Sequence, residues 1–599
     1  MIAGDKPGQI SYDARMQNSS HSRFIPKRVT TWLERFQLRL ARADALLALS
    51  LLGLISGLLA GLVIIVFRLA LEWTQALYLG EGSDGFGALA PLWRFLLPVG
   101  GGLLIGLMMQ YARQEWRSVG VSHVMERLQY HQGRFPLPNA VLQFFGAWLA
   151  LASGHSVGKE GPVVHLGVAA SNIPAQRLGL PNNSLRVLAA CGTAAAIAAI
   201  FNTPLAGVAF AMEVLMFEYT VAAFAPVLLA AVSATVLAQL VFGNELAFVV
   251  PSLSMGNLSE LPLVLVLGIL IGILSASFIR LLRSSFLRTR AWPWWLRGLV
   301  AGLVVGTAGY FVPEIMGLGY DTVNRLILGE LALWLMLAIV VLKLLASTVT
   351  VGMGIPGGLI GPALVVGAAC GGSVGYVASY LGWVEASSIG FYVLLGMGAM
   401  MAGTLQAPLA GLIAILELTG NPGTIFPGML AVITATLVSA WLHGQESMFQ
   451  TMLTATGRDY RNDPLAQSLR RVGVAAVMDK ALLHLPSRVS RQELEVLLED
   501  SPRWILVESG EELPVLLAAV DVAIALREQP VLLELDLAEL PAKRLQMAVV
   551  DLHATMQDAR ECLRDYHVEA LLVVRRQGEV LSRIYGVLTA SAVENSYRY

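Results

Sequence analysis

One carboxylate stands in an otherwise apolar stretch of the chain, within the run Gly158-Lys159-Glu160-Gly161-Pro162. Glycine and proline interrupt helices, so this run is expected to open a new one. A helix N-terminus attracts anions through its free N–H groups and its dipole. Glu160 is therefore expected to compete with an anion for the same amides and to release them when protonated. This would make a gate sensitive to pH and to the anion; the alternative is a simple acidic cap at a membrane surface.

Few other polar side chains interrupt the apolar stretches. His155 and His165 flank Glu160 and titrate near neutral pH, so each is a candidate for tuning a pH response. The alternative is a buried neutral histidine with a satisfied hydrogen bond. Lys343 is expected to snorkel to the surface or to pair with a carboxylate, and we assign it no role.

The composition is that of a membrane protein. Of 599 residues, 56% are hydrophobic and only 14% are charged, whereas soluble domains carry about 25% charged residues. The 58 glycines fit closely packed membrane helices. A net charge of −1 provides no basic field for nucleic acid. Cys191, Cys370 and Cys562 are far apart, so neither a disulfide framework nor a metal site is expected.

Apolar stretches follow one another from about residue 45 to about residue 456. Several have the roughly 20 residues needed to cross a bilayer. Shorter ones, broken by glycine or proline, are tolerated where they are buried or line a cavity. The basic segment before them favours a cytoplasmic N-terminus. The clear stretches are 45–71, 93–109, 139–153, 186–201, 221–242, 260–278, 297–312, 331–350, 363–381, 389–402 and 427–442.

Three motifs recur in the same order in two halves of this region. Such halves with interrupted helices are typical of secondary transporters and channels, in which helix N-termini meet near the midplane. Because charges are so few, backbone amides rather than Lys or Arg are expected to hold the anion. The matched pairs are 118–120 with 317–319, 161–167 with 361–367 (361 − 161 = 200) and 204–213 with 408–417 (408 − 204 = 204).

These motifs resemble the signatures of the CLC family of chloride channels and transporters. The matching runs are Gly158 to Pro162, Asn202 to Gly207 and Gly357 to Pro362. The resemblance implies an all-α polytopic membrane protein built as an inverted repeat of broken and tilted helices. It also implies a homodimer with a separate anion pathway in each subunit. The domains expected are a cytoplasmic N-terminal segment (1–43), a CLC-type membrane domain (44–456, halves about 44–242 and 260–456) and a cytoplasmic C-terminal domain (458–599).

Residues 458–599 resemble a tandem pair of CBS modules, an α+β domain common in this family. Each module reads helix, strand, turn, strand and helix. Such pairs often bind adenine nucleotides through the aspartate of a Thr-x-x-Asp run, which here reads Thr589-Ala590-Ser591-Ala592; the first module, at Asp521 to Ile524, lacks it as well. A structural or dimer-stabilising role without a cofactor is therefore favoured, and nucleotide binding is the alternative. The strand and turn segments are 504–507, 509–511 and 515–520, and 570–574, 577–579 and 584–588.

The resemblance also assigns residues to the anion pathway. Glu160 resembles the external gating glutamate of the family. The backbone N–H groups of Leu359 and Ile360 resemble anion ligands, and 158–161 resembles the loop that lines the outer and central sites. The residues placed at the anion sites are Val119, Gly120, Gly158, Lys159, Gly161, Leu359, Ile360 and Phe449.

Two departures from the family remove hydroxyl groups from the central anion site. The first loop usually reads Gly-Ser-Gly-Ile-Pro, but here Val119 stands at the serine position, 160 − 119 = 41 residues before Glu160. Phe449 stands where the last membrane helix usually has a tyrosine. An anion that leaves water needs replacement hydrogen bonds. Affinity and selectivity are therefore expected to differ from those of the family.

A third departure concerns protons. Proton-coupled members carry a second glutamate just after the position of Glu213, where this chain has Val214. A valine cannot relay a proton. Glu213 itself has the counterpart Glu417 in the second half, so helix packing explains its presence. The chain is therefore expected to move anions passively or with weak proton coupling, unless a substitute proton path exists.

The expected function is transmembrane chloride transport, gated by Glu160 and by pH. A proton/chloride antiporter is the alternative. Fluoride is a weaker candidate, because fluoride-exporting relatives change the residue that this chain keeps as Lys159. No enzyme is expected, since no nucleophile, base or metal cluster converges, and the acidic residues are too sparse for cation-selective rings. The expected partners are a small anion, membrane lipid and a second copy, in the inner (plasma) membrane with both termini cytoplasmic.

Overall fold

The structure is a computed structural model, and its description covers most of the chain. The described residues are 27–42, 45–79, 85–217, 220–244, 248, 253, 255–385, 389–458, 463–508, 514–528, 533–577 and 580–596. The first 26 residues of the predicted N-terminal segment, the turn predicted at 509–511 and residues 578–579 of the second turn lie outside them.

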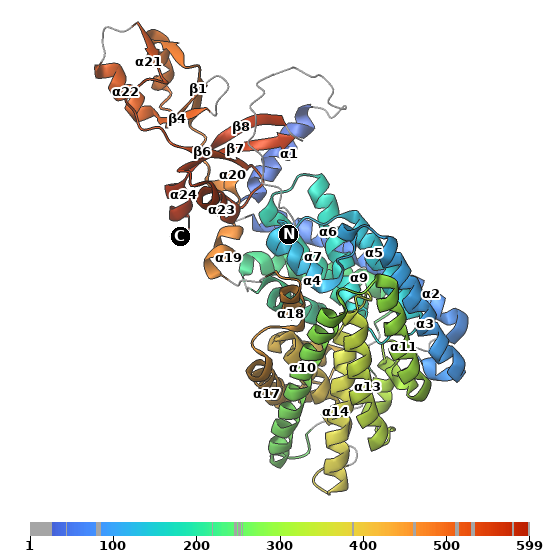
Figure 1. Cartoon of the computed structure of the whole chain (residues 1–599). Helices are drawn as coiled ribbons and strands as arrows, with labels where there is room; N and C mark the ends of the chain where they lie inside the picture. Colours follow the sequence, from blue (N-terminus) through green and yellow to red (C-terminus); the bar gives the residue numbers. More distant parts are fainter. Residues whose placement is uncertain are drawn as a thin grey trace. The chain divides into compact units, whose positions relative to one another are not determined.

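The chain divides into two compact units. Unit 2 comprises 46–178 and 185–461, and unit 1 comprises 1–45, 179–184 and 462–599. Each unit is described by itself. In Figure 1, unit 2 is a block of helices, whereas unit 1 combines small sheets with short helices.

The first half of unit 2 follows the apolar stretches of the sequence. The elements are α2 (Leu46–Leu79), η1 (Phe86–Ala88), α3 (Pro91–Tyr111), η2 (Gln114–Trp116), α4 (Gly120–Tyr130), α5 (Leu137–Ala152), α6 (Glu160–Arg177), α7 (Asn182–Phe201), α8 (Pro204–Phe210), the π-helical turn η3 (Ala211–Met216) and α9 (Val221–Phe242).

The second half repeats this order. The elements are η4 (Leu258–Glu260), α10 (Leu261–Thr289), α11 (Trp294–Phe311), η5 (Pro313–Ile315), α12 (Tyr320–Ile327), α13 (Leu333–Gly352), α14 (Ile360–Tyr380), α15 (Ile389–Leu405), α16 (Pro408–Thr419), η7 (Pro422–Thr424), α17 (Ile425–His443) and α18 (Met448–Ala455).

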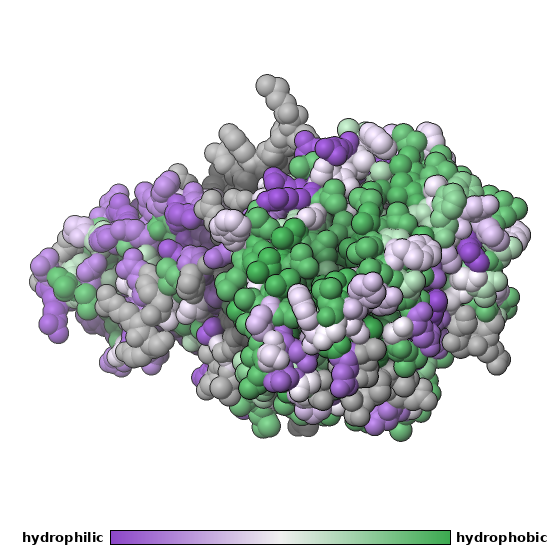
Figure 2. Space-filling view, turned by 90° about the horizontal axis from the view of Figure 1, so that it is seen from below, coloured by the Kyte–Doolittle hydropathy of each residue, from purple (hydrophilic) through white to green (hydrophobic). Residues whose placement is uncertain are grey.

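Among the described residues, eight helices are long and apolar enough to cross a membrane. Many of their large apolar side chains are exposed, such as Leu51, Leu62 and Leu240. Figure 2 shows a broad hydrophobic face on the larger part of the molecule. Because exposed apolar surface on this scale is unfavourable in water, this face fits contact with lipid.

The predicted glycine and proline breaks are helix starts. Helices α6 and α14 begin within the Gly-Pro motifs, and α8 and α16 begin at Pro204 and Pro408. The loops before α4 and α12 both turn on a glycine with a left-handed backbone, Gly120 (φ 79°) and Gly319 (φ 80°). Equivalent breaks in the two halves confirm the predicted fold class.

Small residues let the helices of each half pack closely. A Cβ added to Gly167 on α6 would overlap the carbonyl of Gly192 on α7. In the second half, a Cβ on Gly367 of α14 would overlap the carbonyl of Gly396 on α15. Close backbone approach of this kind is how membrane helices gain packing energy. The same contact therefore holds the same pair of helices in both halves.

Unit 1 contains two modules of the same topology. The sheets have the orders β1-β3-β4 and β6-β7-β8, each with one parallel and one antiparallel pair, and β2 pairs with β5. This α+β arrangement fits a CBS-like domain. The elements are α1 (Lys27–Leu40), α19 (Pro464–Arg470), α20 (Val474–Val477), β1 (Leu482–Leu485), β2 (Arg488–Ser490), α21 (Arg491–Glu499), β3 (Trp504–Val507), β4 (Val515–Ala518), α22 (Ala519–Glu528), β5 (Glu534–Asp536), β6 (Met547–Asp551), α23 (Met556–Tyr566), β7 (Ala570–Gln577), β8 (Val580–Thr589) and α24 (Ala590–Asn595).

The stretch 179–184 belongs to unit 1, although in sequence it lies between two apolar helices. Its backbone and side chains bond to segments far away in the chain. The Asn182 N–H donates to the carbonyl of His553 at 3.0 Å, and Asn183 Nδ2 donates to the carbonyl of Leu40 at 3.0 Å. These contacts explain why unit 1 is not continuous in sequence.

Candidate anion pathway

Glu160 is the first residue of α6, and its side chain is 1% exposed. Its carboxylate lies against three glycines from the two halves, Gly158, Gly358 and Gly361, which we call the glycine floor. A Cβ added to Gly358 would come 2.6 Å from Oε2, and one added to Gly361 would come 2.9 Å from Oε1. A Cβ on Gly158 would overlap Oε2 outright. Only glycines leave room for the carboxylate at this point.

The two halves meet at this floor. The N–H of Gly158 donates to the carbonyl of Gly358 at 2.7 Å, and the N–H of Gly358 donates to the carbonyl of Gly158 at 2.6 Å. This antiparallel bridge places the N-terminus of α6 beside that of α14. The positive ends of two helix dipoles therefore converge on the space that the Glu160 carboxylate fills.

The Glu160 carboxylate is held by charge and dipoles rather than by good hydrogen bonds. Neither oxygen makes a hydrogen bond of normal geometry with a described residue, although its own N–H and that of Gly361 face it. Lys159 and Lys343 both attract it. The burial of this carboxylate differs from what an acidic cap exposed at a membrane surface would show.

A cavity of about 240 Å³ lies beside Lys159. The Lys159 ammonium stands 5.1 Å from the ring centres of both Phe201 and Tyr320. Arg68 also lines this cavity and is paired with Glu72 at 2.6 Å. Among the described residues that line this cavity, Lys159 and Arg68 are cationic and Glu72 is acidic.

The loop that precedes α4 lies near α18, as the resemblance implies. Ser122 Oγ donates to the carbonyl of Phe449 at 3.2 Å. Val119 is the N-cap residue of α4 and offers its helix no side-chain hydrogen bond. The side chains at the two positions that lack a hydroxyl therefore belong to neighbouring elements. Leu359 and Ile360, which begin α14, lie in the same apolar cluster as Phe449.

Two buried amides support the loop before α4, and the sequence analysis did not identify them. Gln143 Oε1 accepts the N–H of Gly120 at 2.7 Å, so this N–H donates to protein. Asn139 Nδ2 donates to the carbonyls of Glu115 (3.1 Å) and Ser118 (3.0 Å). Two polar residues four apart inside an apolar helix are the sequence signal that could have identified them.

Lys343 neither snorkels nor pairs directly with a carboxylate, so the sequence interpretation was wrong. Its side chain is fully buried, and Nζ donates to the carbonyls of Ile315 (3.0 Å) and Gly317 (2.9 Å). The ammonium therefore satisfies two carbonyls of the loop before α12. Lys343 thus holds the loop before α12 much as Gln143 holds the loop before α4.

Glu213 and Glu417 cap helices of the opposite half. Glu213 accepts the N–H groups of Leu409 (3.2 Å) and Ala410 (2.7 Å) at the start of α16. Glu417 accepts the N–H groups at the start of α8 at 3.0 and 2.7 Å. The packing role expected for Glu213 is thereby confirmed. Val214 follows within η3, is 1% exposed and lies in an apolar cluster.

The histidines differ in their surroundings. His155 Nδ1 lies 2.9 Å from Ser153 Oγ, a local contact within the loop before Glu160. His165 Nε2 lies 2.9 Å from Nδ1 of His123 on α4, a residue that the sequence analysis did not single out. The only signal for His123 was a second histidine in a short amphipathic segment.

Two helix N-termini that converge on a buried carboxylate, in a unit whose described helices are long enough to cross a membrane, suit a membrane protein that passes anions. Comparison with known proteins agrees. The family model described as voltage gated chloride channel matches residues 101–440. The chain therefore belongs to the voltage-gated chloride channel (CLC) family, whose members are transporters and channels and not enzymes.

Relatives of this chain include both channels and exchangers by name. It is 33% identical over 432 residues to a ClcB-like chloride channel protein of Ralstonia nicotianae, covering 70% of this chain and 100% of that one. It is 28% identical over 432 residues to the H(+)/Cl(-) exchange transporter ClcA of Vibrio cholerae, covering 69% and 90%. A solved slow cyanobacterial Cl-/H+ antiporter has the same fold, with a TM-score of 0.60, 23% identity and coverage of 68% and 97%.

Proposed function

We propose that the chain transports chloride through unit 2 and that Glu160 is the gate. The observation that carries the proposal is the position of the Glu160 carboxylate on the glycine floor, between the N-termini of α6 and α14. A small anion has the same charge as the carboxylate and the same affinity for these helix ends. The names of the channel and exchanger relatives support chloride as the anion.

Gating follows because the Glu160 carboxylate and an anion compete for the same helix N-termini. An ionised Glu160 occupies the helix ends and excludes an anion. Protonation removes its charge, and a high chloride concentration displaces it by mass action; either change opens the pathway. The cavity lined by Lys159 and Arg68 is the proposed entrance by which anions reach this gate.

The central site has fewer donors than the family pattern. Backbone N–H groups of Leu359 and Ile360 are the proposed ligands there. Neither Val119 nor Phe449 can donate a hydrogen bond from its side chain. The central anion is therefore held weakly, which favours release and fast passage over tight binding.

Proton coupling is proposed to be weak or absent, because Val214 stands in place of the relay glutamate. A coupled proton/chloride antiporter is the second candidate. The buried pair of His123 and His165 favours it, since titratable groups are rare inside the membrane unit.

Further proposals follow from family membership. The subunit is proposed to form a homodimer in the inner (plasma) membrane, with both termini in the cytoplasm. Unit 1 is proposed to be a CBS pair that stabilises the dimer without a nucleotide, because Ala592 stands where a ribose-binding aspartate would be. In α24 the N-cap Thr589 accepts the N–H of Ala592, so this turn is already capped by protein.

Chloride efflux from proteoliposomes tests the function. Valinomycin carries the compensating potassium, and a protonophore is added or omitted. Efflux that is fast without the protonophore supports a passive or weakly coupled pathway. Efflux that stalls without it indicates tight antiport, and absence of efflux in both conditions contradicts chloride transport.

A further inference from the structure

A buried pair of histidines joins α4 to α6. Nδ1 of His123 lies 2.9 Å from Nε2 of His165, and the residues are 4% and 1% exposed. The ring of Phe135 packs edge-on against both, with centroids 6.2 and 6.1 Å away. Packing fixes the two rings so that one imidazole donates a hydrogen bond to the other.

One ring nitrogen of His165 is not used in the hydrogen bond to His123. Nδ1 of His165 is buried and has no hydrogen-bond partner among the described residues. A buried polar atom without a partner calls for a functional explanation. When His123 Nδ1 is the donor within the pair, His165 Nδ1 carries a hydrogen that it can give up.

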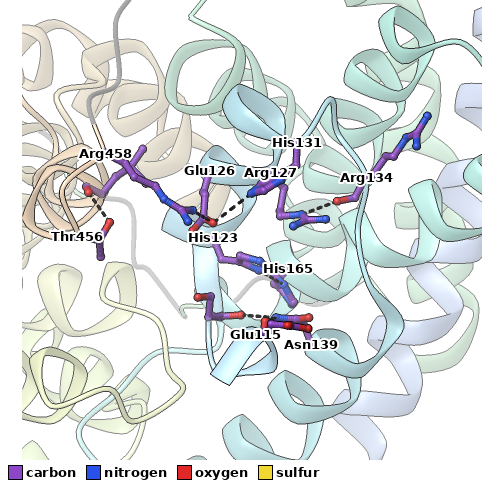
Figure 3. A network of polar contacts seen from close by, with 12 residues as sticks. Glu115, His123, Glu126, Arg127, His131, Arg134, Asn139, His165, Thr456 and Arg458 are labelled. Atoms are coloured by element: carbon purple, nitrogen blue, oxygen red, sulfur yellow. Dashed lines mark hydrogen bonds and ion pairs between the residues drawn. The ribbon is translucent and has the colours of Figure 1, made fainter. Parts of the chain in front are cut away.

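Other polar side chains lead from the pair to the edge of unit 2 (Figure 3). Glu126 lies one helical turn after His123 on α4 and is paired with Arg458 and, at 3.7 Å, with Nε2 of His131. The side chain of His131 is half-exposed, that of Glu126 is mostly buried and that of His123 is buried. The series thus leads inward from the membrane face that bears Arg458, from which the chain continues into unit 1.

The inner end of the series lies on the helix of the gate. His165 follows Glu160 by five residues on α6, about 7.5 Å along the helix axis. Val214, where a relay carboxylate is missing, lies in one apolar cluster with Val124 of α4 and Val164 of α6. The pair therefore lies on two helices that contribute to the same apolar cluster as the residue unable to carry a proton.

We propose that His123 and His165 are a proton-transfer pair that carries protons between the membrane face at Arg458 and Glu160, in place of a carboxylate at Val214. This inference rests on the part of the proposed function in which Glu160 gates chloride transport, and it favours the second candidate, a coupled proton/chloride antiporter, over weak coupling. It adds a route by which the gate exchanges protons with the solution near Arg458.

Within the pair, the transfer involves N–H bonds alone. A proton from water adds to Nε2 of His123, which then carries a hydrogen on both nitrogens. Its Nδ1 hydrogen passes to Nε2 of His165, and the Nδ1 hydrogen of His165 passes through intervening water to the Glu160 carboxylate, which becomes a neutral carboxylic acid. The net change is one proton moved; both rings end in the other neutral tautomer and return by the reverse transfer or by ring rotation.

Burial is the first cost of a positive charge on the pair, because both rings are almost fully buried and Phe135 packs against each. The partner ring of His165 and the cationic side chains of Arg127, His131 and Arg458 add to this cost at His123. We therefore expect an added proton to pass on rather than to stay on the pair.

The test measures proton uptake driven by a chloride gradient in weakly buffered proteoliposomes with valinomycin. The variants are His123→Gln and His165→Gln, which keep hydrogen bonding but cannot carry a proton at this pH. The matched control is His155→Gln, a buried histidine outside the pair. We expect each pair variant to lower proton flux by about a hundredfold or more while chloride flux persists, and the control to keep both.

The outcomes separate this inference from the proposed function. Chloride flux without protons in the wild type overturns the relay alone, as does proton flux that survives both pair variants. Absence of chloride flux in the wild type overturns both. If a glutamine variant does not fold, a spectrum of the wild-type protein containing ¹⁵N-histidine decides: coupling across one imidazole N–H···N bond is expected, and its absence overturns the pair.

Discussion

Helices α6 and α14 begin at equivalent places in the two halves, yet the two residues between their shared glycines are charged in one half and apolar in the other. Residues 158–161 read Gly-Lys-Glu-Gly, whereas 358–361 read Gly-Leu-Ile-Gly. The glycine backbones bond to each other as equals, through two hydrogen bonds of 2.7 and 2.6 Å. One scaffold therefore carries a titratable carboxylate in the first half and apolar side chains in the second.

The neighbouring helices also share a frame between the two halves but differ in their titratable side chains. Gln143 and Lys343 are equivalent in the repeat (343 − 143 = 200), and each holds the loop in front of it. His165 corresponds to Val365 by the same offset, so only the first half has a histidine pair. The difference teaches that symmetry supplies the frame of the pathway, while the titratable chemistry is concentrated in one half.

The largest effect is expected from a substitution at the bridge between Gly158 and Gly358, where the two halves meet. In Gly358→Ala, the added methyl group would lie 2.6 Å from Oε2 of Glu160 and 2.8 Å from the Gly161 nitrogen. We expect loss of measurable chloride flux, because the carboxylate and both helix starts must shift. In Gly100→Ala the added methyl group meets nothing within 4 Å, and this control should transport normally. Normal flux in Gly358→Ala would contradict the crossing geometry.

The next largest effect should come from making the first half resemble the second in charge. In Glu160→Gln the side chain keeps its shape but never carries the charge that competes with chloride. In the wild type, flux should rise as pH falls, since protonation releases the gate. In the variant, flux should stay at the acidic level, with about a twofold change or less between acidic and neutral pH. An unchanged pH profile would reject Glu160 as the gate.

A smaller effect is expected at the two glutamates that play the same capping role in both halves. Glu213→Gln and Glu417→Gln each remove one acceptor and the charge from a helix start of the opposite half. Each should lower the free energy of unfolding by about 1–2 kcal/mol. Thermal unfolding followed by fluorescence should therefore show similar shifts for both. Loss of proton or chloride flux in Glu213→Gln alone, at equal stability, would assign that residue a transport role instead.

The smallest effect concerns the missing hydroxyls. Val119→Ser restores a donor next to the central site, and one hydrogen bond contributes about 0.5–1.5 kcal/mol. Halide binding measured by calorimetry should strengthen by roughly two- to tenfold. Val119→Ala makes a similar reduction in size without a hydroxyl and serves as the control. Equal binding in the two variants would place the central anion away from Val119.

Much of the fold could be predicted because its signals are local. Gly-Pro breaks predicted the starts of α6 and α14, and the spacing of 200 residues predicted two equivalent halves. Glu160 was predictable as a site because a carboxylate is costly in an apolar segment. Lys343 was misread because a charged side chain in an apolar helix can be accommodated in two ways. It can reach the surface, or it can donate hydrogen bonds to buried carbonyls, and residue type and spacing do not distinguish the two.

The sequence by itself determined the membrane class, the two halves, the position of the carboxylate proposed as the gate and the absence of polar side chains at Val119, Phe449 and Val214. These depend on residue type and spacing, which fix helix starts and available atoms. Only the tertiary structure decided that Glu160 lies on glycines of both halves, that Glu213 and Glu417 cap each other's halves and that His123 meets His165. Each of these is a contact across a long separation in sequence (42 residues for the histidines), and only packing brings such atoms within hydrogen-bond distance.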